Sequence, residues 1–138
     1  MLDALSMKPS RYRFEVAAAF VLGVALPVLE VSRRRTHFDD IPGYIDDFII
    51  GALLFFAATC VVRQRAYGHA LLVAAWGILC GGLWSSFLGQ VYNPSSSDIS
   101  GLPNIIVVSA KLAVYVVAIV CLVLSIVRSG SETSTHNK

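Results

Sequence analysis

The sequence predicts an all-α integral membrane protein, built as a bundle of four transmembrane helices with both termini in the cytoplasm (N-in/C-in). Hydrophobic residues make up 56% of the 138 residues and charged residues only 14%, and the mean hydropathy is +0.68. A soluble chain this short has too much surface for its volume to bury so many apolar groups. The apolar residues also gather in four continuous runs without alternation, which excludes the strands of a membrane barrel.

The four apolar runs define a single transmembrane domain at residues 14–127, between two polar tails. The helices are expected at about residues 14–31, 44–62, 70–91 and 105–127. About 20 helical residues cross a hydrocarbon core of about 30 Å, so each run is long enough to span. Residues 1–13 form a basic cytoplasmic tail, and residues 128–138 are expected to be a disordered cytoplasmic tail. The first run lacks an A-x-A cleavage site, which favours an uncleaved anchor over a signal peptide.

The orientation follows from the Lys and Arg residues that flank the spans, because cytoplasmic loops carry an excess of these residues. In a chain with four spans, seven Lys and Arg residues share one side of the membrane: Lys8, Arg11, Arg13, Arg63, Arg65, Arg128 and Lys138. The other side has three, in the triplet Arg33, Arg34 and Arg35, together with acidic residues that partly offset them. We therefore expect a multi-pass protein of the plasma (inner) membrane with both termini cytoplasmic.

The third run carries small residues at strict four-residue spacing. These residues are Gly77, Gly81, Ser85 and Gly89, which we call the glycine ridge. On a helix they make a shallow face that another backbone can approach closely. Two interpretations stay open: the ridge packs against another helix of the same chain, or it forms a homodimer. A weaker counterpart on the first run is the pair Ala19 and Gly23.

Lys111 is the charged residue that most needs an explanation, because intramembrane charges are costly and rare. It lies about seven residues into the last span, roughly 10 Å below the outer end at 1.5 Å per residue. One interpretation is that its ammonium reaches the interface along its aliphatic stem. The other is an ion pair with an outer-side carboxylate, ranked Asp47, then Asp46, then Glu30. For the aspartates themselves, the dipole of the helix they begin is an alternative explanation.

No other pattern indicates a metal, a cofactor or catalysis. His37 and the aspartates of residues 37–47 form an acidic cluster, but its spacing matches no metal motif, so a solvated loop is favoured over a cation site. Cys60, Cys80 and Cys121 lie in apolar runs without CxxC spacing, which favours small buried apolar groups. We find no phosphate loop, HExxH or GxSxG motif.

Two functions remain from the sequence. The first is a non-enzymatic accessory or structural subunit that acts through helix–helix contacts with a second copy or another membrane protein. The second is a small homodimeric transporter or channel, with a polar site formed by Lys111 and the outer carboxylates. Besides these protein partners we expect the lipid bilayer, and no nucleic acid, because the net charge is only +2.

Overall fold

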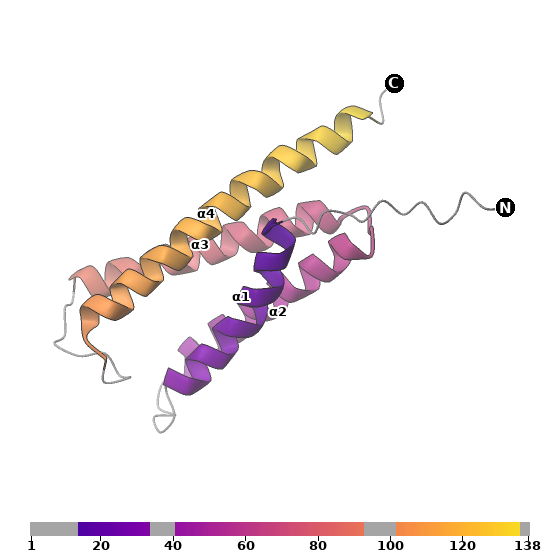
Figure 1. Cartoon of the computed structure of the whole chain (residues 1–138). Helices are drawn as coiled ribbons and strands as arrows, with labels where there is room; N and C mark the ends of the chain where they lie inside the picture. The colour runs from indigo at the N-terminus through magenta and orange to yellow at the C-terminus, as the bar shows by residue number, and fades with distance from the viewer. Residues whose placement is uncertain (1–13, 34–40, 93–101, 136–138) are drawn as a thin grey trace.

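Four helices make up the described part of the chain, which in this computed structural model is residues 14–33, 41–92 and 102–135. They are α1 (Phe14–Arg33), α2 (Ile41–Val62), α3 (Gly68–Tyr92) and α4 (Asn104–Thr135), as Figure 1 shows. Each is long and apolar enough to cross a membrane. The all-helical class and the four candidate spans are thus confirmed, and they fit a small multi-pass membrane protein. Residues 1–13, the expected N-terminal tail, lie outside the described residues, and so do residues 37–40 of the acidic cluster, whereas residues 41–47 begin α2.

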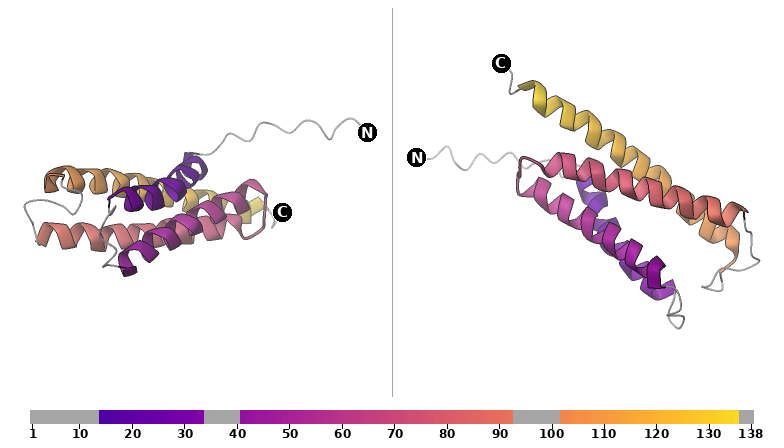
Figure 2. Two further views of the ribbon diagram at one scale, coloured as in Figure 1. Left: turned by 90° about the horizontal axis from the view of Figure 1, so that it is seen from below. Right: turned by 180° about the vertical axis from the view of Figure 1, so that it is seen from behind.

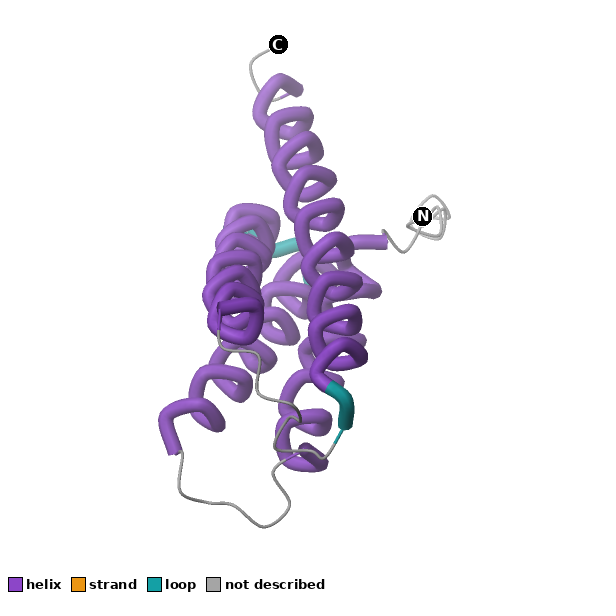
Figure 3. The backbone as a smooth tube through the Cα atoms, turned by 90° about the vertical axis from the view of Figure 1, so that its left-hand side faces the viewer, coloured by secondary structure: helices purple, strands orange, loops and turns teal. Residues whose placement is uncertain are grey.

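The helix bounds agree closely with those expected, except where α2 begins and α4 ends. Because α2 begins at Ile41, Pro42 falls in its first turn, where a missing N–H costs no hydrogen bond. α4 continues to Thr135, so residues 128–135 are helical, where a disordered tail was expected. This stretch contains no proline, and adding turns to an existing helix is far easier than starting one. Figure 3 shows these turns extending beyond the other helices.

The helices contact one another in ring order: α1 with α2, α2 with α3, α3 with α4, and α4 with α1. Of these interfaces the one between α1 and α4 is the slightest, and within the described residues the backbones of the diagonal pairs do not approach each other closely. One end of the bundle, which we call the link end, contains the start of α1, the turn between α2 and α3, and Arg128. At the opposite end the α1/α2 hairpin lies apart from the α3/α4 hairpin (Figures 1 and 2).

The hydrophobic core lies toward the link end and draws on all four helices. Its buried members are Val16 and Ala19 of α1, Leu54, Ala57 and Ala58 of α2, Leu72, Ala75, Trp76 and Leu79 of α3, and Ala118 and Cys121 of α4. Beyond Leu79, no residue of α3 is buried. The bundle is therefore packed at the link end, and α3 has little cover along its second half.

A close contact between helices joins α1 and α2 at two glycines. A Cβ at Gly51 would lie 2.7 Å from the backbone oxygen of Gly23 and 2.9 Å from the Pro27 ring. A Cβ at Gly23 would lie 2.9 Å from the backbone oxygen of Gly51. Close by, the rings of Phe20 and Phe55 meet edge to face with centroids 5.1 Å apart. Only glycine permits this approach, so the two positions fix how α1 rests on α2.

The link between α2 and α3 is a tight turn closed by backbone hydrogen bonds. The N–H of Arg65 donates to the carbonyl of Cys60, and the N–H of Gln64 donates to that of Val61. Gln64 adopts a left-handed φ of 53°. These two bonds and the left-handed residue make a Schellman motif, which satisfies the last carbonyls of α2. Gly68 then starts α3 directly against the backbone of Cys60, with no room for a Cβ.

Candidate functional site

Among the residues whose side chains are described, the most deeply buried charged one is Glu15, in the first turn of α1. Its side chain is only 1% exposed. Ala19 and Gly23 follow at four-residue spacing, so all three lie on the same inward strip of the helix, and both are buried. A carboxylate removed from water needs a charged or hydrogen-bonding partner.

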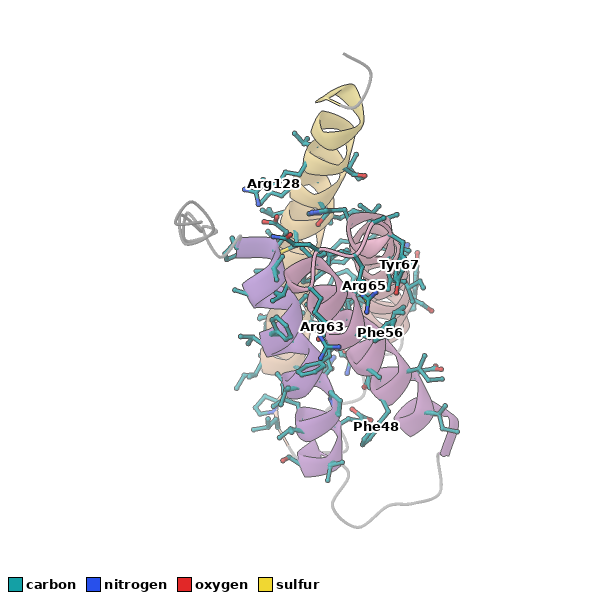
Figure 4. All side chains as sticks on the ribbon, turned by 90° about the vertical axis from the view of Figure 1, so that its right-hand side faces the viewer. Phe48, Phe56, Arg63, Arg65, Tyr67 and Arg128 are labelled. Carbon is teal, nitrogen blue, oxygen red and sulfur yellow. The ribbon has the colours of Figure 1, made fainter. Side chains whose placement is uncertain are left out.

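Arg128 of α4 is that partner. Its Nη1 donates to Oε1 of Glu15, forming an ion pair between the first and the last helix. In Figure 4 the Arg128 side chain extends from α4 toward the start of α1. Cys121 and Ser125 precede Arg128 by seven and three residues, so the three share one face of α4, and the first two are buried. The ion pair therefore closes the α1–α4 interface at the link end.

This polar cluster is only partly satisfied. Oε2 of Glu15 and Oγ of Ser125 are buried and have no hydrogen-bond partner in the described structure, and the same holds for Nε1 of Trp76 in α3. An unsatisfied buried polar atom costs about 1–3 kcal/mol. Such atoms often mark a functional group or a bound water. The cluster is thus a costly polar feature of the described bundle.

Lys111 lies on α4 away from the packed core, and its side chain is partly buried. Its Nζ donates a hydrogen bond of 2.7 Å to Oγ of Ser86 on α3. The ammonium therefore turns toward the neighbouring helix. Of the predicted carboxylate partners, Glu30 is 5% exposed, Asp47 is partly buried and Asp46 is exposed. The ion pair with a carboxylate stays a prediction.

The reason for ranking Asp47 first does not hold. Gly51, one turn after Asp47, was expected to admit the helix that carries Lys111. Gly51 does admit a neighbouring helix, but this helix is α1, whose Gly23 and Pro27 occupy the space. The backbones of the described parts of α2 and α4 do not approach each other closely. The preference for Asp47 over the other carboxylates therefore has no support from Gly51.

The glycine ridge of α3 faces away from the bundle. No atom lies within 4 Å of where a Cβ would stand on Gly77, Gly81 or Gly89, and Ser85 is exposed. One of the two interpretations of its spacing was that the ridge packs against another helix of the same chain. The structure does not show such packing against any described helix. Trp76, which adjoins the ridge in sequence, is fully buried in the core.

Within the described residues, no three His, Cys, Asp or Glu side chains lie together in a way that could hold a metal ion. Of the acidic cluster, the side chains of only Asp46 and Asp47 are described, so the cation site considered there lies mainly outside this part of the chain. The three cysteines are free; Cys60 and Cys121 are buried and Cys80 is partly buried.

Sequence reasoning missed four residues of these polar contacts: Glu15, Arg128, Ser125 and Ser86. Glu15 and Arg128 lie at the ends of apolar runs, where charged residues are ordinarily assumed to face water. A signal was present for Glu15, because it continues the small-residue strip of Ala19 at four-residue spacing. Nothing comparable marks Ser86.

The chain matches no family model, no curated protein and no solved structure. Its function is therefore inferred from the geometry of its own residues.

The Lys111 ion pair is tested by a double-mutant cycle. Removing one partner strands the other charge, so Lys111→Met and Glu30→Gln should each reduce thermal stability in detergent, and the double variant should recover part of the loss. The same cycle applies to Asp47 and Asp46. Ser86→Ala serves as the matched control, because it removes only the observed hydrogen bond, for which about 1 kcal/mol is expected. If the stability losses of Lys111→Met and of each carboxylate variant were strictly additive in all three cycles, Lys111 would be paired with Ser86 alone or would reach the membrane–water interface.

Proposed function

We propose that this chain is a non-enzymatic accessory or structural subunit of a membrane, and that it works through helix–helix contacts made by the glycine ridge of α3. The observation that carries the proposal is the open space in front of Gly77, Gly81 and Gly89, where no atom lies within 4 Å of the Cβ positions.

The position of the ridge on α3 supports an outside partner. An α-helix turns about 100° per residue. By this geometry, Gly77 and Gly81 lie on the side of α3 roughly opposite the buried residues Leu72, Ala75 and Leu79. The bundle uses one side of the helix for its core. The other side is smooth, apolar and free for contact with a further helix.

The physics of membranes also favours this function. Lipid tails are as apolar as the side chains, so helices associate through close packing and polar contacts, with little hydrophobic driving force. Small residues at four-residue spacing allow such packing. Large side chains would serve equally well if the face only met lipid. A continuous row of small residues is therefore better explained by contact with a second copy or another membrane protein.

A small homodimeric transporter or channel is the second candidate. It is favoured by the bond between Lys111 and Ser86 at the opposite end of the bundle, where α3 has no buried residue. Charged groups in transmembrane segments commonly mark ion or substrate pathways. In this function Lys111, with Glu30, Asp47 or Asp46, would form the polar site. Strict additivity in the cycles described above would remove its main support.

The contact function is tested by Gly81→Leu. The larger side chain meets nothing in the monomer, so the fold should be kept, while a partner helix would be pushed away. Native mass spectrometry of protein extracted from its own membrane in mild detergent should show a second copy or another subunit, and this partner should be lost in Gly81→Leu. Ala52→Leu, at an exposed position on α2, is the matched control and should keep it. A parent protein that is monomeric, or a complex that tolerates Gly81→Leu, would contradict the proposal.

We further propose that the link end is cytoplasmic, giving an N-in, C-in protein of the inner membrane. Three described arginines support this orientation, since Arg63 and Arg65 in the link and Arg128 of α4 all lie at that end (Figure 4). Reporter fusions after Arg65 and after the last residue should be active only in the cytoplasm, and a fusion after Ser97 only outside. An external reporter after Arg65 would reverse the orientation.

A further inference from the structure

Each of the two hairpins is held together by its own contacts. In the α1/α2 hairpin these are the close approach of Gly23 and Gly51 and the ring contact of Phe20 with Phe55. In the α3/α4 hairpin the rings of Trp84 and Tyr115 lie 5.9 Å apart between centroids. The Lys111–Ser86 hydrogen bond joins the same two helices. None of these contacts depends on the other hairpin.

Contact between the hairpins is concentrated toward the link end. α2 and α3 meet there through the core, directly beside the short turn that joins them. The other interface, between α1 and α4, is the slightest of the bundle. This interface includes the ion pair of Glu15 with Arg128. At the opposite end the two hairpins lie apart (Figures 1 and 2).

We propose that the Glu15–Arg128 ion pair is a latch that holds the two hairpins together at the α1–α4 interface. When the pair is released, α1 and α4 separate at this interface while each hairpin stays intact. The turn between α2 and α3 is the hinge, because it keeps those two helices together when the latch opens. This inference does not depend on a partner at the glycine ridge, so either proposal can fail alone.

Two features suit the pair to release. The first is its incomplete bonding: one carboxylate oxygen of Glu15 and the neighbouring hydroxyl of Ser125 are buried without partners. A buried pair that is only half satisfied repays less of its desolvation cost than a fully bonded pair, so its release costs less. The second is access. The Arg128 side chain is 36% exposed, so water or an anion can approach the guanidinium while the carboxylate is still buried.

The opened state would bring buried polar groups into contact with water. Glu15 is buried on α1, and Ser125 is buried on the face of α4 that also carries Arg128. Separation of these helices would hydrate the unpartnered oxygen atoms, which offsets the loss of the ion pair. Val16, Ala19 and Cys121, their buried neighbours on the same two helices, are small or medium in size, so a limited separation exposes little apolar surface.

Distance measurements between spin labels in lipid nanodiscs test the latch on the full-length chain. The labels are carried by non-canonical amino acids, so that the native cysteines stay. A pair at exposed positions Ala17 and Ile126 reports on α1 and α4 at the link end. In Glu15→Gln and in Arg128→Gln, the distance distribution of this pair should shift to longer values by more than the width of the parent distribution. The double variant should shift no further than either single variant, because both remove the same bond.

A second label pair, at Val91 of α3 and Ile106 of α4, reports on the interior of one hairpin. Its distribution should be unchanged in all variants. Arg128→Lys keeps the charge and should keep the Ala17–Ile126 distance close to that of the parent. An unchanged Ala17–Ile126 distance in both Gln variants would overturn the latch. If the Val91–Ile106 distance distribution broadened together with a shift of the Ala17–Ile126 pair, the latch would also be overturned, since the whole fold would then depend on the ion pair.

Discussion

The approach of α1 to α2 at Gly23 and Gly51 is the contact on which the other features of the bundle depend. Between membrane helices there is little hydrophobic driving force, so adhesion comes from close packing and from polar contacts. This contact leaves no room for a Cβ on either glycine. It also sets the rotation of α1 about its axis. Glu15 lies two four-residue steps before Gly23 and therefore faces inward, where Arg128 of α4 reaches it.

A bundle packed toward one end can hold polar groups of different kinds at its two ends. At the link end, a core from four helices surrounds a buried carboxylate, and an arginine at the rim neutralises it. At the other end, Lys111 bonds to Ser86 within a single hairpin. Both arrangements reduce the cost of a charge in an apolar environment. The first joins the two hairpins, so it influences how they move relative to each other.

The helices could be predicted from the sequence, because span length and hydropathy depend on the local chain alone. The contacts could not, for a physical reason that the glycines illustrate. Four-residue spacing shows that a helix face is smooth, but it does not show what covers that face. The strongest pattern, from Gly77 to Gly89, is open, whereas isolated Gly51 lies in close contact with α1. For Lys111, the chemistry restricted the expected partners to carboxylates, while the described hydrogen bond goes to a hydroxyl on the adjacent helix.

Two glycine-to-alanine substitutions test most directly whether the helices of the monomer pack against each other at Gly51 and not at the glycine ridge. Gly51→Ala places a methyl group 2.7 Å from a backbone oxygen and against the Pro27 ring, so we expect a loss of about 1–3 kcal/mol in the free energy of unfolding. Gly77→Ala meets nothing within 4 Å and should be neutral or stabilise by up to about 1 kcal/mol through helix propensity. The measurement is reversible unfolding of the monomer in mixed micelles. Equal losses in the two variants, or a greater loss in Gly77→Ala, would contradict this account.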